Sequence, residues 1–220
     1  MKVKDRMSKD VKTAGMDTSL TEAFRIMKEN GIRRLPVMDK EKLAGIITLS
    51  DLNQAAPSSA TSLSIHELNY LLARTKIKDI MPHQQNLLTI GPENYIETAA
   101  KMMRTNKISG LPVVDNGQLL GLITETDIFD ALIDILGVKT AHSRIDFYVK
   151  DRPGSVAEVT GLIGEKGINI LNTVMYFDEK KNRYKMILRI EDMNYQPITE
   201  ELKEHGYEIE SVIVSQSGEE

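Results

Sequence analysis

The sequence predicts a mixed α/β (α+β) protein that joins a duplicated module to a C-terminal domain of different pattern. Residues 21–52 recur 76 positions later, with 13 of the 32 aligned pairs identical. From residue 143 onward, the predicted elements instead follow the order βαββαβ. A repeat of this size indicates one supersecondary module that is used twice and packs against its own copy.

The first copy is predicted to contain one helix followed by two strands. Apolar residues at helical spacing predict a helix from Thr18 to Asn30, and Ser19-Leu20-Thr21-Glu22 fits a capping box at its start. Gly31 follows the helix, where a left-handed cap residue is favoured. Two strands joined by a charged turn are then expected over residues 34–38 and 43–48.

The second copy predicts the same order of elements. A helix is expected from Asn94 to Thr105, followed by strands over residues 111–114 and 118–124. A closing helix runs from Asp127 to Leu136, and Gly137 stops it.

The segments before and between the copies carry three further signals. Residues 54–61 are rich in Ala, Pro and Ser and predict a mobile loop. Residues 64–74 predict a helix with one apolar face. Lys4-Asp5-Arg6-Met7 returns with one change at 78–81, slightly out of step with the main repeat.

The C-terminal part begins with an alternating strand and a Pro-Gly turn, and an amphipathic helix follows. Its βαββαβ order is that of a ferredoxin-like, split βαβ fold. The strands are expected at 144–150, 168–177, 183–190 and 207–214, and the helices at 156–166 and 197–205. We therefore expect a first repeat at 1–60, a linker helix at 61–76, a second repeat at 77–142 and the last domain at 143–215.

Composition excludes several classes of function. The formal net charge is −4 and no basic stripe is interleaved with aromatic residues, which argues against nucleic acid as a partner. The absence of cysteine removes disulfides and thiolate nucleophiles, and the four histidines share no metal-site spacing. No signal peptide, membrane-length apolar run, P-loop or Gly-x-Ser-x-Gly is present. We expect a cytoplasmic protein that is not an enzyme and has no metal site.

The strongest chemical signal is a repeated Gly-x-x-Thr-x-x-Asp, in which Thr48 and Asp51 correspond to Thr124 and Asp127. Each copy lies where a strand ends and a helix begins, and a helix N-terminus presents free N–H groups to a phosphate. The threonines can donate to a phosphate and the aspartates can accept from ribose hydroxyls. Thr and Asp are equally favoured as helix N-caps, so a purely structural role stays open.

Three resemblances follow from these residues. The duplicated Leu-Pro-Val with Gly-x-x-Thr-x-x-Asp resembles a tandem pair of CBS domains, the Bateman module. Asp151-Arg152-Pro153-Gly154 before a helix, with Gly167-Ile168-Asn169-Ile170 after it, resembles an ACT domain, an amino-acid-sensing fold. Joined in this order, they are similar to the acetoin-utilisation accessory protein family of bacteria, over nearly the whole chain.

The CBS resemblance implies a nucleotide site between the two copies. The implied ligand contains adenosine: AMP, ATP, S-adenosylmethionine, NADH or cyclic di-AMP, with no further cofactor required. By matching position, Asp51 and Asp127 hold ribose and Thr48 and Thr124 hold phosphate. The backbone that borders the base runs through Ile32 to Leu35 and Ile108 to Leu111.

The two copies differ at positions that matter for a phosphate. Arg33-Arg34 in the first copy corresponds to Ser109-Gly110 in the second, and Leu49 corresponds to Glu125. Arginines favour a polyphosphate or dinucleotide, whereas a glutamate near a phosphate opposes it. We expect two unequal sites.

The ACT resemblance implies an amino-acid site at the Asp151 to Gly154 turn, which includes Pro153. The carboxylate of the amino acid would meet free N–H groups near Gly154 and Ser155, and Asn169 could reach its polar groups. The alternative is that Pro153-Gly154 only makes a tight turn and the domain dimerises by sheet pairing. A homodimer is expected in either case.

Sensing is the function that these inferences support. A nucleotide, with or without an amino acid, would bias the conformation, and the signal would pass to an unknown protein partner in acetoin-type carbon metabolism. The alternatives are a ligand-independent dimerisation scaffold and, third, an enzyme.

Overall fold

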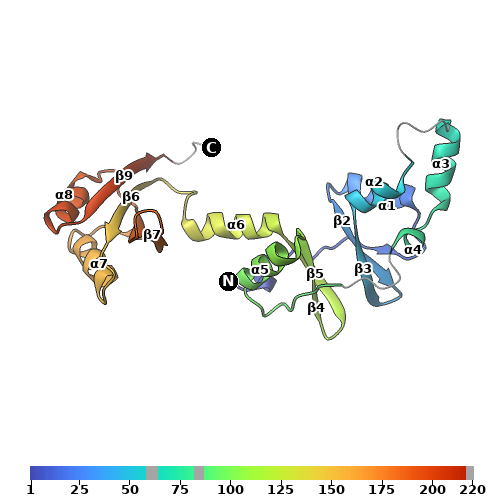
Figure 1. The fold of residues 1–220 in the computed structure, drawn as a ribbon, viewed down its shortest axis with the longest axis horizontal. Helices are drawn as coiled ribbons and strands as arrows, with labels where there is room; N and C mark the ends of the chain where they lie inside the picture. The colour runs from blue at the N-terminus through green and yellow to red at the C-terminus, as the bar shows by residue number, and fades with distance from the viewer. Residues whose placement is uncertain (58–63, 82–86, 217–220) are drawn as a thin grey trace. The chain divides into compact units, whose positions relative to one another are not determined.

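The structure is a computed structural model that describes residues 1–57, 64–81 and 87–216 (Figure 1). The chain divides into two compact units, Met1–Ile128 and Phe129–Glu220. Both are α/β, and they confirm the predicted fold class.

The first copy of the repeat is a small sheet with two helices. Strands β2 (Arg34–Asp39) and β3 (Lys42–Thr48) form an antiparallel pair, and the short β1 (Ala14–Gly15) joins β2 in parallel. Helix α1 (Leu20–Glu29) precedes this pair and α2 (Leu49–Ala55) follows it. The apolar faces of both helices pack against the sheet in one core. The end of β3 leads directly into the first turn of α2.

The second copy repeats this arrangement. Helix α5 (Ile96–Asn106) precedes the antiparallel pair β4 (Gly110–Asp115) and β5 (Gln118–Thr124). A parallel bridge from Ile90 to Val113 takes the place of β1, and both copies have a register shift at the same point of the hairpin. Helix α6 (Glu125–Leu136) follows β5 and continues from the first unit into the second.

The short segments before the two copies are exchanged between them. The 3₁₀ helix η1 (Val3–Asp5) lies on the second copy, where the Val3 N–H donates to the Asn94 carbonyl at 2.8 Å. Helix α4 (Ile77–Ile80) follows α3 (Ile65–Arg74) and lies on the first copy, where the Ile77 N–H donates to the Thr18 carbonyl at 2.9 Å. The echo of Lys4–Met7 at 78–81 therefore marks two equivalent segments, each of which completes the opposite copy.

Most element predictions in this unit are confirmed, with shifts at the ends. The Ser19 hydroxyl accepts from the Glu22 N–H at 3.2 Å, but the reciprocal half of the predicted capping box is absent. The Glu22 carboxylate instead pairs with Arg25 at 2.6 Å. Gln54 and Ala55 belong to α2 and not to the predicted loop, whose residues from 58 onward lie outside the described ones.

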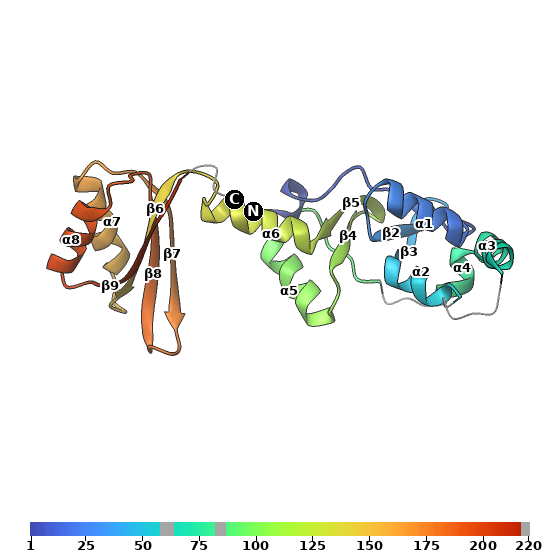
Figure 2. The same cartoon turned by 90° about the horizontal axis from the view of Figure 1, so that it is seen from above.

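The second unit confirms the βαββαβ order. Its sheet has the order β7-β8-β6-β9 with antiparallel neighbours, and both helices cover one face (Figure 2). The buried side chains between sheet and helices include Phe147, Ile163 and Leu202. The elements are β6 (His142–Val149), α7 (Ser155–Glu165), β7 (Ile170–Asp178), β8 (Arg183–Ile190), α8 (Gln196–Glu204) and β9 (Glu208–Ser215).

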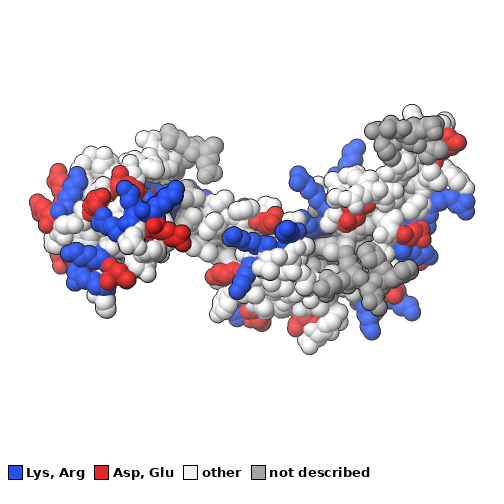
Figure 3. Space-filling model, in the orientation of Figure 1, with Lys and Arg blue, Asp and Glu red and all other residues white. Residues whose placement is uncertain are grey.

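Basic and acidic side chains are interspersed on the face shown in Figure 3. Among the described residues, no group of three or more His, Asp or Glu side chains is placed to hold a metal ion. The helices of the described chain are all too short or too polar to span a bilayer.

Candidate functional site

The loops that lead into β2 and β4 are each tied to the helix that follows their own hairpin. The Leu49 N–H at the start of α2 donates to the Arg33 carbonyl at 2.8 Å. The Glu125 N–H at the start of α6 donates to the Ser109 carbonyl at 3.2 Å, the equivalent bond in the second copy. Both bonds fix a loop, a strand end and a helix start as one rigid corner.

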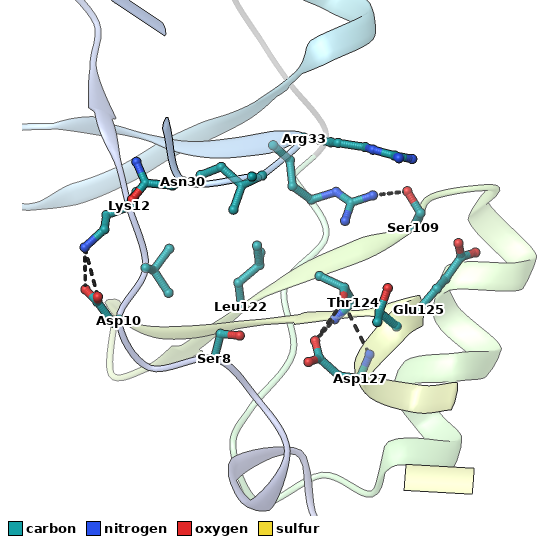
Figure 4. A pocket seen from close by; sticks show the side chains of 15 residues that line it. Ser8, Asp10, Lys12, Asn30, Arg33, Ser109, Leu122, Thr124, Glu125 and Asp127 are labelled. Atoms are coloured by element: carbon teal, nitrogen blue, oxygen red, sulfur yellow. Dashed lines mark hydrogen bonds and ion pairs between the residues drawn. The ribbon is translucent and has the colours of Figure 1, made fainter. Parts of the chain in front are cut away.

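A cavity of about 730 Å³, here called the first cleft, lies between a corner of each copy (Figure 4). The first copy contributes its loop with Arg33, and the second contributes the start of α6 with Thr124 and Asp127. The segment before β1 closes one side. The full lining is Ser8, Asp10, Val11, Lys12, Asn30, Gly31, Ile32, Arg33, Arg34, Ser109, Leu122, Thr124, Glu125, Thr126 and Asp127.

A second cleft of about 240 Å³ is related to the first by the repeat. Thr48 takes the place of Thr124, and Ile108 takes the place of Ile32. Arg34 and Ser109 line both clefts, and also a shallow depression beside the start of α2. The corresponding aspartates differ, because Asp127 is half-buried in the first cleft whereas Asp51 is exposed and lines neither.

The Thr and Asp side chains cap their helices in both copies. The Thr124 N–H and hydroxyl donate to Asp127 Oδ2 at 2.7 and 2.8 Å, and the Asp127 N–H donates back to the hydroxyl. Thr48 and Asp51 make the same bonds, with 2.7 Å for both donations to Oδ2. Both motifs therefore cap their helices. The caps use only Oδ2 of each aspartate, and no donor from the described chain meets Oδ1 of either one.

Two arginines line the first cleft. Within the described ranges, neither Arg33 nor Arg34 forms an ion pair, whereas Lys12 is neutralised by Asp10 at 2.9 Å. The half-buried Arg34 donates to the Ser109 hydroxyl. Burial lowers the pKa of Arg34, while the nearby carboxylate of Glu125 opposes this shift. The lining as a whole has three basic and three acidic side chains, so the arginines share the cleft with Glu125, which was expected to oppose a phosphate.

The structure brings together most residues that the sequence predicts for a nucleotide site, but across the two copies. Ile32, Arg33 and Arg34 of the first copy share a cleft with Thr124 and Asp127 of the second. Leu35 and Leu111, at the ends of the predicted base-contacting segments, are fully buried and line neither cleft.

Sequence reasoning missed the residues that close the first cleft from the side of the N-terminal segment. These residues precede β1 and reach the cleft because the Ser8 N–H donates to the Leu122 carbonyl on β5 at 2.9 Å. The similarity of Lys4–Met7 to residues 78–81 could have indicated them, because it marks the exchanged segments. The missed residues are Ser8, Asp10, Val11 and Lys12.

The turn before α7 lines a separate cavity of about 430 Å³. Asp151, Gly154 and Ser155 line it, but Pro153 and Asn169 do not. Two expectations are wrong here. The Ser155 N–H is not free, because it donates to the Arg152 carbonyl at 3.3 Å. Asn169 does not reach the turn, because its side chain donates to Glu191 at 2.8 Å.

Two family models match the chain. The CBS domain model matches residues 3–58 and 77–134, which hold both corners of the first cleft. The ACT domain model matches residues 143–204.

Similar proteins cover the CBS part of the chain. A CBS domain-containing protein of Dictyostelium discoideum is 39% identical over 136 residues, which are 61% of this chain and 92% of that protein. Inosine-5′-monophosphate dehydrogenase of Korarchaeum cryptofilum (strain OPF8) is 38% identical over 122 residues, 55% of this chain, but the match spans only 22% of the enzyme. A solved protein of Vibrio cholerae assigned to acetoin utilization (AcuB) is 29% identical with a TM-score of 0.50, covering 61% of this chain and 91% of that one.

Proposed function

This chain belongs to the CBS-domain family and carries an ACT domain after its CBS pair, and from that premise we propose that it is a nucleotide sensor. Its ligand contains adenosine and binds in the first cleft. The single observation that carries the proposal is that Asp127 and two arginines with no ion pair in the described chain line one cavity. The volume of about 730 Å³ lies within the range of small-molecule sites.

Each part of an adenylate finds complementary chemistry in this cleft. The open Oδ1 of Asp127 accepts from ribose hydroxyls, as an acidic residue does in dinucleotide-binding folds. The apolar side chains of Ile32 and Leu122 suit the face of the base. Arg33 and Arg34 suit a phosphate, because charge-assisted hydrogen bonds from guanidinium groups are the strong ones.

The proposed output is regulatory and not catalytic. The first turn of α6 carries Asp127 and the same helix continues into the unit that holds the ACT domain. A ligand that binds differently to two states of this helix shifts their populations. The cavity at the turn before α7 would take an amino acid, although Pro153 and Asn169 of the expected site do not line it. Similarity to the Vibrio cholerae protein supports a role in acetoin-type metabolism, through an unknown protein partner.

The test is a titration of nucleotide-free protein with AMP, ATP, S-adenosylmethionine, NADH and cyclic di-AMP, followed by thermal melts and calorimetry. A ligand at 100 times its Kd stabilises the folded state by about 2.7 kcal/mol, which is a readily measured shift. We expect at least one adenylate to bind and Asp127→Ala to abolish that binding.

The control separates the ligand role of Asp127 from its capping role. Loss of a cap costs about 1 kcal/mol. Asp79 accepts from the Lys76 N–H at 2.8 Å in the same way at the start of α4, outside both clefts. Asp79→Ala is expected to lower the melting temperature and leave binding intact. No binding by the wild type would favour the ligand-independent scaffold. Undiminished affinity in Asp127→Ala would contradict the assignment of the ribose contact to Asp127.

A further inference from the structure

One buried cation of the second unit lies on the face of the sheet away from α7 and α8. Arg189 is on β8, where it pairs with Asn172 of β7 on one side and with Arg144 of β6 on the other. Its neighbours Leu188 and Ile190 enter the core under the two helices, so strand alternation turns Arg189 to the opposite face. Although α7 and α8 do not cover this face, Arg189 is only 4% exposed.

The neighbouring basic side chains of this face are paired with acids, but Arg189 is not. Arg144 donates to the two carboxylate oxygens of Asp146 at 2.7 and 2.8 Å. Lys185 contacts Asp146 at 3.2 Å and also pairs with Glu210. Within residues 1–57, 64–81 and 87–216, no carboxylate forms an ion pair with Arg189. The cluster therefore has one more buried positive charge than its acids neutralise.

Three buried polar atoms of the Asn172–Arg189 pair have no hydrogen-bond partner in the described chain. They are Nε and Nη1 of Arg189, which are donors, and Oδ1 of Asn172, which is an acceptor. Buried polar atoms are nearly always hydrogen-bonded in proteins, because leaving one unpaired is costly. The pair thus presents two donors and one acceptor to a group that the described residues do not supply.

These atoms define the chemistry of that group. A carboxylate suits Arg189, because an anion offsets the cost of a buried, unpaired guanidinium. The free Oδ1 of Asn172 calls for a hydrogen-bond donor. A neutral hydroxyl meets this need, whereas an ammonium would be repelled by Arg189 and by Arg144, whose charge adds to burial in lowering the pKa of Arg189. The ligand must be small, since the unpaired atoms do not reach solvent.

We infer that this face of the sheet binds a small hydroxycarboxylate, which Arg189 holds by the carboxylate and Asn172 by the hydroxyl. The site is separate from the nucleotide cleft and from the cavity before α7, and the inference does not depend on either. The amide of Asn172 donates to the Ile135 carbonyl at 2.7 Å, so the site adjoins the last turn of α6. Its occupancy would therefore bear on the end of the helix whose first turn carries Asp127.

The binding test compares two probes, lactate and propionate, by calorimetry on the full chain at equal ionic strength. Propionate has the carboxylate but lacks the hydroxyl. Lactate should bind roughly 2- to 10-fold more tightly, the range expected for one added hydrogen bond. Arg189→Met should abolish lactate binding, and Asn172→Ala should reduce lactate to the affinity of propionate. Any binding of alanine, which carries an ammonium in place of the hydroxyl, should be the same in Arg189→Met as in the wild type.

Thermal melts without ligand separate a binding role of Arg189 from a structural one. Arg189→Met removes an unpaired buried charge and should leave the melting temperature unchanged or higher. Arg144→Met is the matched control from the neighbouring strand, and it should lower the melting temperature because Asp146 loses its bidentate partner.

Two sets of results would overturn the inference. One is a melting temperature that falls as far in Arg189→Met as in Arg144→Met, which would make Arg189 a structural residue. The other is a wild type that does not bind lactate, binds it no more tightly than propionate, or binds it with the same affinity as Arg189→Met. Each of these results leaves the proposed nucleotide sensor untouched.

Discussion

Single residues in this protein serve two purposes at once. Thr124 and Asp127 cap α6 through Asp127 Oδ2, and no donor from the described chain meets its Oδ1, so the capping and ligand-binding interpretations of the motif are not exclusive. The same motif in the first copy caps α2 but leaves Asp51 exposed and outside both clefts. Sequence identity between the copies therefore does not imply equal sites.

Gly110 offers a residue-scale prediction, because its missing side chain leaves room for Arg34. In Gly110→Ala the new Cβ lies 3.0 Å from Arg34 Cδ, so the arginine must shift. The strand has no positive φ at this position, and we expect the free energy of unfolding to change by less than about 1 kcal/mol. AMP affinity should nevertheless fall several-fold in calorimetry.

The matched control is Gly161→Ala in α7, where the new Cβ meets nothing within 4 Å. It should leave AMP binding unchanged and raise the melting temperature slightly, since alanine is the better helix former. If Gly110→Ala binds AMP as tightly as the wild type, phosphate binding by Arg34 does not depend on the space beside Gly110.

At the scale of elements, the exchanged N-terminal segment is held by ion pairs as well as by backbone bonds. Lys2 and Lys4 each contact the Glu93 carboxylate at 2.6 Å. These contacts lower the pKa of Glu93 from 4.5 to about 2. All three side chains are largely exposed, so dissolved salt screens the attraction.

Glu93 therefore makes the free energy of unfolding depend on pH. Its folded-state pKa is depressed, so its contribution is complete above about pH 4.5 and is lost as the pH falls toward about 2. Urea unfolding of wild type and Glu93→Gln should show a stability difference at pH 6 that shrinks across this window. The difference should also shrink in 0.5 M salt, as screening requires.

Glu97→Gln is the control for this series. Glu97 is exposed in the first turn of α5 and forms no ion pair within the described chain. A pH dependence in Glu97→Gln that is as flat as that of Glu93→Gln would contradict the assignment to the Lys2–Glu93–Lys4 contacts.

Local sequence patterns predicted the helices and strands well, but they did not predict which residues the fold brings together. Strands 118–124 and 183–190 match β5 and β8 to the residue, because hydrophobic alternation and turn residues are encoded locally. The predicted helix at Asn94 starts two residues early, since Asn94 turns back to the Gly91 carbonyl and Ile96 begins α5. The union of Arg34 with Asp127 in one cleft depends on contacts between residues far apart in sequence, which periodicity does not record.

At the scale of the whole molecule, the sheet of the second unit has two edges with exposed apolar side chains. Tyr176 on β7 is 43% exposed and Ile213 on β9 is 54% exposed. Unpaired strand edges with apolar side chains favour pairing with another chain. The homodimer expected from the ACT resemblance would use one of these edges.

Light scattering on the full chain tests this expectation. The wild type should have twice the mass of one chain, and Tyr176→Lys combined with Ile213→Lys should be monomeric, since edge lysines oppose strand pairing. The single variants then identify the edge. Phe129→Lys changes a 61% exposed apolar residue on α6, which is not part of the sheet, and should remain dimeric. A monomeric Phe129→Lys, or a dimeric double variant, would place the interface elsewhere.

The exchange of η1 and α4 between the copies has a consequence for how the chain is made. As the protein leaves the ribosome, the first copy lacks α4 until residues 77–80 emerge, and η1 lacks its backbone partners until Pro92 and Asn94 follow. Each copy therefore gains one of its segments from the other, although each resembles a complete module in sequence. The two similar halves of the repeat thus share one compact unit, which is complete only after the second half has been synthesised.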